Sequence, residues 1–368
     1  MVATSALAAC TLTLGDSWSS GIPEAAAAND PLIDLLNPFA DLSPSAPNPI
    51  LGHRESLAAG EQTQASNDIV ALSINASAGA ELVDAALADA TADPALAMSE
   101  ALGTQLGPLF AEALQHGDLP KTSSLLNEGL RDGLANPSNA KAHFAYKRPF
   151  IRLGFADQGG HLTRTSSPEY AKLAKDGSFP SGHTINGYLA GTALATLLPE
   201  FGPQLLARAS QFAHHRIVLA MHYPLDVMGG RMAAQRVLQA RWSNAGSREV
   251  LDDAAAELRS VLTSRCQTAG HGPDLKACAS AGTAYLSTEA AVAVYTERLT
   301  YGLGSVLPVT APCGGEGSDQ LVAAIPPGAE DLLLTAAPSL DASGRRALLA
   351  ATAAAPGSPL DTRTGQGS

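Results

Sequence analysis

Apolar residues recur every three or four positions through much of this chain, and this spacing constrains its fold more than any other feature. The stretch NDIVALSINASAGAELVDAALADA, residues 67–90, is the first clear example, and such spacing lines one face of an α-helix. Aromatic residues make up only 5% of the chain, whereas alanine and leucine abound. Because alanine and leucine favour helices over strands, the sequence predicts an all-α fold, a helical bundle.

Proline and glycine divide the helical pattern into separate candidate helices. Beyond the first stretch, these cover residues 94–117, 121–135, 139–148, 182–200, 203–221, 224–242 and 248–264. The helix at 139–148 should close before Pro149, because the residue before a proline resists helical geometry. A long polar connection lies between Gly154 and Ser178, and connections of that length are often lids or binding loops.

The composition of the chain divides it into three parts. Residues 1–55 are rich in proline, serine, asparagine and aspartate, and we expect a loose segment with one short helix near residues 31–36. Residues 56–300 contain the predicted helices and should form the catalytic domain. Residues 301–368 begin with a linker-like stretch and then offer two short helix candidates, so we expect a C-terminal extension.

The charge and hydropathy of the chain limit its partners. Its 368 residues carry a formal net charge of −12, and an acidic chain lacks the basic surface that nucleic-acid binding needs. No uninterrupted apolar run of about 18 residues appears, so we expect no transmembrane helix. The most apolar stretch, residues 185–202, is interrupted by glycine and contains Pro199, which is typical of a helix buried in a core.

The chain has four cysteines, and their spacing bears on its compartment. Cys266 and Cys278 lie close in a polar, glycine-containing region, where a disulfide would fit an oxidising environment; the alternative is two unpaired thiols. Cys313 has no evident partner except Cys10. The segment LAAC, which ends at Cys10, resembles the cleavage box of bacterial lipoproteins, although the basic residues of a signal peptide are missing. Two interpretations therefore stay open: a lipid anchor at Cys10 in a chain that starts further upstream, and a flexible tail.

Three separated segments hold residues that could bind and transform a phosphate group. The first contains Lys141 and Arg148, the second is PSGH at residues 180–183, and the third is HHRIVLAMHYPLD at residues 214–226. Lys141 and Arg148 are about two helical turns apart, so we expect one helix face to present both.

Together these segments could form a cradle for an anion. Arg216 lies late on another predicted helix, and with the two earlier cations it would attract a tetrahedral oxyanion, whose geometry suits the guanidinium fork. Ser181 and Gly182 precede a helix that we expect to begin at His183. Their backbone N–H groups should therefore be free to bind an anion at the helix N-terminus, and the glycine would let the ligand approach closely.

Two histidines would convert this cradle into a catalyst. His222 precedes Asp226 by four positions, and a carboxylate that accepts from Nδ1–H would leave Nε2 free to attack phosphorus. His183 would protonate the departing oxygen and then activate water against the phosphohistidine. The cations would stabilise charge on the phosphoryl oxygens, so the sequence predicts a reaction that needs no metal or other cofactor.

These segments resemble the signature of the type 2 phosphatidic acid phosphatase superfamily, which includes bacterial class A non-specific acid phosphatases, lipid phosphate phosphatases and vanadium-dependent haloperoxidases. The family pattern is Lys, six residues, Arg-Pro; then Pro-Ser-Gly-His; then Ser-Arg, five residues, His, three residues, Asp. The matching positions are Lys141, Arg148, Pro149, Pro180, Ser181, Gly182, His183, Arg216, His222 and Asp226. The sequence departs at His215, where the family has serine. The resemblance implies a helical bundle that hydrolyses phosphate monoesters through a phosphohistidine.

Three other functions are compatible with the same residues. A vanadium-dependent haloperoxidase would hold vanadate, its cofactor, in this cradle with His222 as covalent ligand. A lipid or polyprenyl phosphate phosphatase would act on a larger substrate, especially if Cys10 is lipidated. A phosphate-binding protein would keep the cradle without turnover. We favour a bacterial, extracytoplasmic phosphatase for small phosphate monoesters, and we leave its oligomeric state open.

Other basic residues near the motifs carry no predicted catalytic role. We expect surface positions in loops or on helices for His143, His161, His214 and His215, of which His161 lies in the long connection and could touch substrate. Lys147 should face solvent and Arg231 should be structural. The loop before Pro180 is locally basic, which could draw in anions or could be an ordinary solvated run; its basic residues are Arg164, Lys172 and Lys175.

Overall fold

The computed structural model describes residues 30–36, 59–129, 135–303, 322, 325 and 327–351. Within these residues the regular structure is helical, and the pairing of extended segments is limited to an isolated bridge between Phe155 and Leu162. The all-α prediction is therefore confirmed. The predictions on Cys10 and Cys313 lie outside the described residues.

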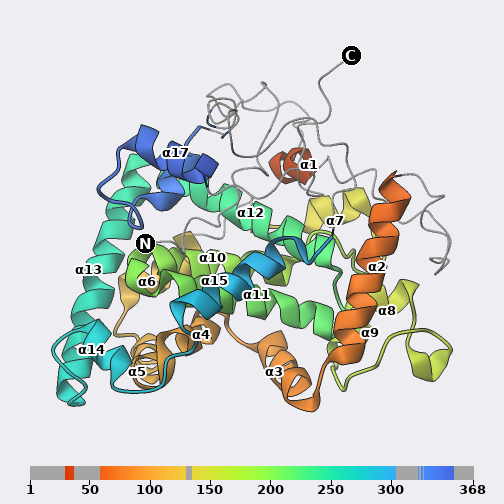
Figure 1. Cartoon of the computed structure of the whole chain (residues 1–368), viewed down its shortest axis with the longest axis horizontal. Helices are drawn as coiled ribbons and strands as arrows, with labels where there is room; N and C mark the ends of the chain where they lie inside the picture. The colour runs from red at the N-terminus through yellow and green to blue at the C-terminus, as the bar shows by residue number, and fades with distance from the viewer. Residues whose placement is uncertain are drawn as a thin grey trace.

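Helix α10, Gly182–Leu197, runs through the centre of the bundle, as Figure 1 shows. It is buried on nearly all sides, because apolar and small residues surround its axis. Helices α11, Gly202–Val218, and α12, Pro224–Trp242, pack against it. The contact with α11 is close: a Cβ atom at Gly187 would lie 2.5 Å from the ring of Phe212.

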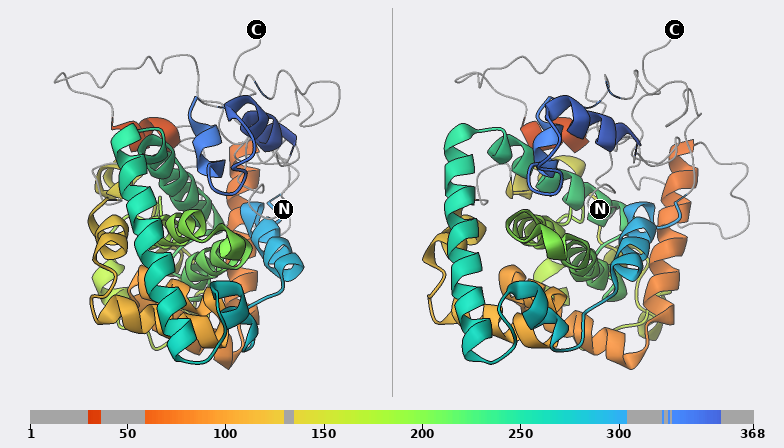
Figure 2. Two further views of the ribbon diagram at one scale, coloured as in Figure 1. Left: turned by 90° about the vertical axis from the view of Figure 1, so that its left-hand side faces the viewer. Right: turned by 60° about the vertical axis from the view of Figure 1, so that its left-hand side comes forward.

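Longer helices frame this centre (Figure 2). Helix α13, Ala245–Thr268, runs along one side and α2, Ala59–Ser77, along the opposite side. Helices α3, Ala80–Thr91, and α5, Gly103–Gln115, lie between them at one end. The other elements are α1 Pro31–Leu36, α4 Pro94–Ala97, η3 Met98–Leu102, α6 Pro120–Ser124, η4 Leu125–Gly129, α7 Ser138–Phe144, α8 Pro149–Arg152, η6 Ala156–Gln158, α9 Glu169–Leu173, η7 Pro199–Phe201, α14 Leu275–Ser280, α15 Thr288–Thr300, η8 Ala329–Leu333 and α17 Ala342–Ala351.

Several predicted helices are divided in the structure. The stretch 67–90 breaks at Gly79, which caps α3, and the axes of α2 and α3 differ by 110°. The stretch 94–117 breaks at Gly103, whose φ of +82° lies in the left-handed region that favours glycine. The pattern of apolar residues continues across both breaks, which is why it did not reveal them.

The predicted helix at 139–148 is also wrong, and this division affects the candidate site. Helix α7 ends at Phe144, and Ala145 adopts a left-handed φ of 51°. Arg148 is extended, with ψ of 153°, and α8 begins at Pro149. Proline forces this geometry on the residue before it and suits the first position of a helix. Lys141 therefore lies on α7, and Arg148 lies outside it as the N-cap of α8.

Among the described residues, no single helix is both long and apolar enough to cross a membrane; α2 from Gln64 and α3 pass that test of length and composition only as a bent pair.

Cys266 in α13 and Cys278 in α14 form the predicted disulfide, with Cα atoms 5.7 Å apart. Beyond residue 303, the described residues include η8 and α17, which share a small apolar cluster with Ile325. Asp331 of η8 accepts a hydrogen bond from Ser243 at 3.0 Å, so this part packs beside the end of α12. The boundaries at residues 55 and 300 remain predictions.

Candidate active site

The turn between α11 and α12 brings Arg216 and His222 together. Ala220 has a left-handed φ of 56°. The N–H of Ala220 donates to the carbonyl of Ile217 at 2.8 Å, and the N–H of Met221 donates to that of Arg216 at 2.9 Å, which is the Schellman ending of a helix. The N–H of His222 reaches the same Arg216 carbonyl at 3.2 Å. The residues between Arg216 and His222 therefore form the end of α11, and this turn places His222 next to the carbonyl of Arg216.

Asp226 both starts α12 and orients His222. Pro224 is the first residue of α12, Tyr223 is its N-cap, and Asp226 is its third residue. Oδ2 of Asp226 accepts hydrogen bonds from the N–H of Tyr223 at 2.8 Å, from Nδ1 of His222 at 3.1 Å and from the hydroxyl of Ser178. The bond to the N-cap N–H is half of a capping box. The carboxylate that begins the helix therefore also fixes the imidazole.

Burial controls the protonation of this pair. Both side chains are almost inaccessible to solvent. Burial raises the pKa of Asp226 to about 6, against the opposing effects of its hydrogen bonds from Ser178 and Tyr223. Burial also lowers the pKa of His222 well below its ordinary value, and the charge of Arg148 lowers it further. His222 is therefore neutral in the folded protein.

Lys141 and Arg148 meet at one carboxylate although they lie on different elements. Nζ of Lys141 and Nη2 of Arg148 are each 2.6 Å from Oδ2 of Asp176. The two cations therefore converge, but through the turn between α7 and α8 and not along one helix face. Burial lowers the pKa of Lys141, with Asp176 opposing this shift.

Arg216 provides the third cation from the last turn of α11. Its Nη1 donates to Oε2 of Glu169 at 2.8 Å, whereas its buried Nε has no hydrogen-bond partner. The charge of Arg216 lowers the pKa values of both His222 and His183, so it lies within electrostatic reach of both imidazoles. A buried guanidinium N–H without a partner is rare, and an anionic ligand would satisfy it.

Ser181 caps helix α10, which begins at Gly182, one residue before the predicted start. Its hydroxyl oxygen accepts from the N–H of Thr184 at 3.2 Å. Its own N–H donates to the carbonyl of Asp226 at 3.0 Å, so the prediction that this N–H is free is wrong. The N–H groups of Gly182 and His183 belong to the first helical turn, where a helix offers no acceptor of its own.

His183 lies in that first turn with its ring stacked on Phe212. The ring centroids are 4.1 Å apart and the planes differ by 8°. Nε2 of His183 is buried and has no hydrogen-bond partner. Burial lowers the pKa of this imidazole well below its ordinary value, and Arg216 adds to the effect. His183 is therefore a neutral ring that a nearby negative charge would help to protonate.

His215 is not at a helix surface, and this prediction was wrong. The side chain is buried because α3 and α15 both cover α11. Its Nδ1 lies 2.6 Å from Oδ2 of Asp89, and Arg208 binds both oxygens of that carboxylate at 2.6 and 2.9 Å. His214 is also partly buried, with its ring stacked against Tyr301.

The other predictions on neighbouring residues agree with the structure. His143, His161 and Lys147 are exposed. Arg231 is buried, and its Nη1 donates to the carbonyl of Leu299 at 3.0 Å, which is a structural contact.

Sequence reasoning missed several residues that contact the predicted site, and three of them bond to its charged side chains: Glu169, Asp176 and Ser178. All three lie in the connection between Gly154 and Ser178, which the sequence marked only as a candidate functional loop. Its location directly before the PSGH motif was a signal, but the sequence could not show which polar side chains fold back onto the cations.

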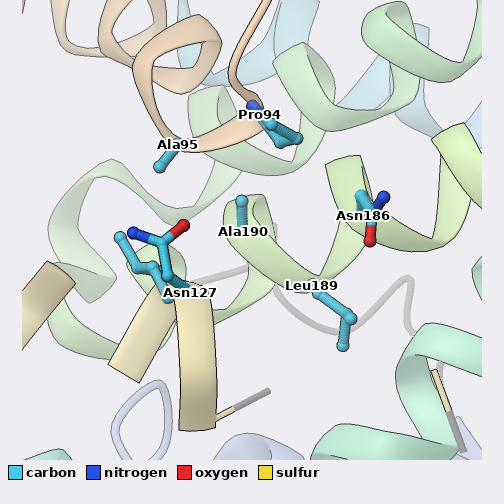
Figure 3. A pocket seen from close by; sticks show the side chains of 7 residues that line it. Pro94, Ala95, Asn127, Asn186, Leu189 and Ala190 are labelled. Atoms are coloured by element: carbon cyan, nitrogen blue, oxygen red, sulfur yellow. The ribbon is translucent and has the colours of Figure 1, made fainter. Parts of the chain in front are cut away.

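In the part of the chain that the structure describes, pockets also lie outside this cluster. Figure 3 shows one between α4, η4 and α10, with the amide side chains of Asn127 and Asn186 among its lining residues. Another, of about 390 Å³, lies beside α5 and includes Glu100 and Tyr285. Neither pocket shares a residue with the group of cations and histidines described above.

Residues 123–246 match the family model described as the PAP2 superfamily. This part of the chain is a PAP2 superfamily domain. All the site residues predicted from the sequence, from Lys141 to Asp226, lie within the PAP2 domain.

Three bacterial proteins are similar to part of this chain over part of their own length. An acid phosphatase of Zymomonas mobilis is 30% identical over 165 residues, which is 45% of this chain and 58% of the relative. A non-specific acid phosphatase of Providencia stuartii is 28% identical over 149 residues, 40% of this chain and 57% of the relative. A non-specific acid phosphatase of Salmonella typhi is 30% identical over 125 residues, 34% of this chain and 47% of the relative. The chain thus spans about half the length of the relatives it matches.

Proposed function

We propose that this protein hydrolyses phosphate monoesters through a phosphohistidine formed on His222. The observation that carries the proposal is the hydrogen-bonded series from Arg148 through His222 to Asp226, over 2.9 and 3.1 Å. A neutral imidazole whose Nδ1 is held by a carboxylate presents the lone pair of Nε2 among buried cations. The names of the three relatives support phosphate ester hydrolysis.

In the first half of the reaction, Nη1 of Arg148 would move its hydrogen bond from Nε2 of His222 to a phosphoryl oxygen. The freed lone pair of Nε2 attacks phosphorus, and the bond between phosphorus and the ester oxygen breaks. His183 donates a proton to that oxygen, so the product leaves as an alcohol. The negative charge of the bound phosphoryl group would raise the pKa of His183 from its low value and so supply the acid form. The buried Nε2 of His183, which has no protein partner, is the candidate donor.

In the second half, His183 acts as a base. It takes a proton from water, the water oxygen attacks phosphorus, and the bond between phosphorus and Nε2 breaks to release inorganic phosphate. Asp226 keeps the proton on Nδ1 throughout and stabilises the charge that His222 gains when it is phosphorylated. Lys141, Arg148 and Arg216 would hold the equatorial oxygens, where the charge of the transition state accumulates.

The substrate side and the compartment are part of the same proposal. We infer a small phosphate monoester as substrate and an oxidising, extracytoplasmic location, which the disulfide between Cys266 and Cys278 supports. We propose that the reaction uses no metal, because the residues around His222 already provide the nucleophile, the acid and the cations.

The direct test is hydrolysis of p-nitrophenyl phosphate in the presence of a chelator. We expect turnover by the wild type and its loss, by a factor of about 10³ or more, in His222→Ala. His116→Ala, at the exposed end of α5, is the matched control and should keep the wild-type rate. Equal rates in wild type and His222→Ala, or a rate that depends on added metal, would contradict the proposal.

The same preparation separates the alternatives drawn from the sequence. Vanadate fits the same set of cations, so bromide oxidation by peroxide that requires vanadate, without phosphatase activity, would replace the proposal with a haloperoxidase. Hydrolysis of a lipid phosphate in detergent, but not of p-nitrophenyl phosphate, would replace the small substrate with a lipid. Phosphate binding without any turnover would leave a binding protein.

A further inference from the structure

Two carboxylates from one segment cover the three cations of the candidate site. Asp176 contacts both Lys141 and Arg148, at 2.6 Å each, and Glu169 contacts Arg216 at 2.8 Å. The cations are buried, with side-chain exposures of 13%, 1% and 4%, whereas Asp176 is 40% exposed. The carboxylate of Asp176 therefore lies on the solvent side of the cations.

We propose that Asp176 and Glu169 are specificity-determining residues that set the charge of the anion this site accepts. This inference rests on the proposed function and deepens it: the site would favour the phosphoryl group in its singly charged form over a dianion. Acidic conditions produce that form of a phosphate monoester.

The position of Asp176 is fixed by its backbone and not only by the ion pairs. Its carbonyl accepts a hydrogen bond from Nε of Arg148 at 3.2 Å. The next residue, Gly177, packs so closely on α7 that a Cβ atom there would lie 2.7 Å from the carbonyl oxygen of Lys141. The N–H of Ser178 donates to the carbonyl of Tyr146 at 2.8 Å. These contacts fix Asp176 against the cations, unlike a mobile surface pair.

The charge balance of the site follows from these contacts. Burial raises the pKa of Asp176, but its bonds to Lys141 and Arg148 outweigh that effect and hold the pKa below its usual value. Asp176 thus stays ionised in mild acid. Three cations and these two carboxylates leave a single positive charge, and Asp226 adds a negative charge only above the pH of about 6 to which burial raises its pKa. Both histidines are neutral below and above that pH.

A single net positive charge distinguishes between anions of the same shape. A monoanion neutralises the site, whereas a dianion brings a second negative charge close to Asp176 and Glu169. Like charges in contact near a protein surface repel each other, and solvent and salt reduce this repulsion without removing it. Removing one carboxylate charge should therefore improve binding of a dianion far more than binding of a monoanion.

The test compares two non-reacting probes by calorimetry at mildly acidic pH: sulfate, which is a dianion there, and methylphosphonate, which is a monoanion. We expect Asp176→Asn to raise the affinity for sulfate relative to methylphosphonate by about tenfold. Glu169→Gln should act in the same direction. Asp157→Asn is the matched control, because it removes a carboxylate of the same connection that pairs with Arg164 and with none of the three cations, and it should not change the ratio.

Each other outcome has a defined meaning. If Asp176→Asn and Glu169→Gln lower or leave unchanged the affinity for both probes alike, the carboxylates only position the cations and the inference is overturned. Circular dichroism and thermal unfolding show that each variant is folded before its ratio is counted. If Lys141→Ala binds both probes as well as the wild type, the cations do not form an anion site, and it is the proposed function that fails.

Discussion

Nη1 of Arg148 donates a hydrogen bond to Nε2 of His222 over 2.9 Å, and it also donates to the carbonyl of Met221 at 3.0 Å. Because a guanidinium can only donate, Nε2 must be the acceptor, which leaves the ring proton on Nδ1 facing Asp226. The guanidinium therefore keeps the attacking nitrogen unprotonated. It also lies where negative charge would develop on a phosphoryl group bound to that nitrogen.

Replacing Ser178 with alanine should weaken catalysis by changing Asp226. The Ser178 hydroxyl donates to Oδ2 of Asp226 and lowers the pKa of that carboxyl, so its loss should raise the pKa above about 6. If Asp226 must be ionised to orient His222, the acidic limb of the rate profile moves to higher pH. We expect kcat to fall about tenfold, as for a lost hydrogen bond to a charged group.

The measurement for Ser178→Ala is kcat across pH, with Ser210→Ala as control. Ser210 is also buried, but its hydroxyl donates to the carbonyl of Ala207 within α11. Its loss should affect stability and leave the pH profile in place. An acidic limb that stays where it is in Ser178→Ala would show that this hydroxyl does not act through Asp226.

Gly230→Ala should disturb the contact between α12 and the start of α10. A Cβ atom at Gly230 would lie 2.7 Å from the carbonyl oxygen of Ser181 and 2.9 Å from Cβ of Thr184. Separating the helices would cost about 1–3 kcal/mol of unfolding free energy and move Asp226 away from the first turn of α10, so activity should fall with stability. Gly246→Ala, where the nearest atom lies at 3.4 Å, should be neutral or stabilising in urea unfolding; equal effects at both glycines would contradict this explanation.

Asp89→Asn should destabilise the protein most strongly near neutral pH. Burial raises the pKa of Asp89, but hydrogen bonds from His215 and Arg208 outweigh it and hold the pKa below 3.8. A carboxyl with a depressed folded pKa stabilises above its unfolded pKa and loses that contribution as pH falls through the folded value. We expect a loss of about 3 kcal/mol at pH 7, because the buried Arg208 would lose its buried charged partner and keep only Glu100, which is largely exposed.

Urea unfolding of Asp89→Asn at several pH values checks this expectation, with Asp252→Asn, an exposed residue of α13, as control. The difference from the wild type should shrink in strong acid for Asp89 and stay near zero throughout for Asp252. A loss for Asp89→Asn that does not depend on pH would mean that its charge is not what stabilises the fold.

Removing the disulfide should lower stability without affecting catalysis. Cys266 and Cys278 are 12 residues apart, and a loop of that size contributes about 3 kcal/mol through the unfolded chain. The bridge joins the last turn of α13 to α14, and α14 packs on α5. The double serine variant should therefore unfold at a lower temperature with unchanged kcat, and a reductant should lower the unfolding temperature of the wild type alone. A fall in kcat at a temperature where the variant is folded would contradict this.

The helical class could be predicted from apolar spacing and helix propensity, which agreed with each other. The central helix could be predicted because the stretch that forms α10 is apolar on all sides. The breaks at Gly79 and Ala145 could not, since apolar spacing continues through a change of axis. Arg148 illustrates the difference: the proline after it predicted that no helix continues through Arg148. It did not predict that α7 already ends at Phe144 or that a second helix starts at Pro149.

The motif residues were identified because phosphate chemistry restricts which residue types can serve together. Their partners were not, because any polar residue in a loop can face solvent or fold inward. Asp176 lies in an ordinary polar stretch, and only the approach of Gly177 to α7 places it on two cations. His215 was misplaced for a similar reason: its burial depends on Asp89, which lies 126 residues earlier in the chain.

The most direct test of a covalent mechanism on His222 is to trap the intermediate. Wild-type enzyme mixed with radiolabelled phosphate ester and quenched in denaturant at short times should carry acid-labile phosphate, and peptide mapping should locate it on His222. His183→Ala should accumulate more label if it slows hydrolysis more than formation, and His222→Ala should carry none. Turnover of the ester by the wild type with no covalent phosphate at any time, or with phosphate on another residue, would contradict the account.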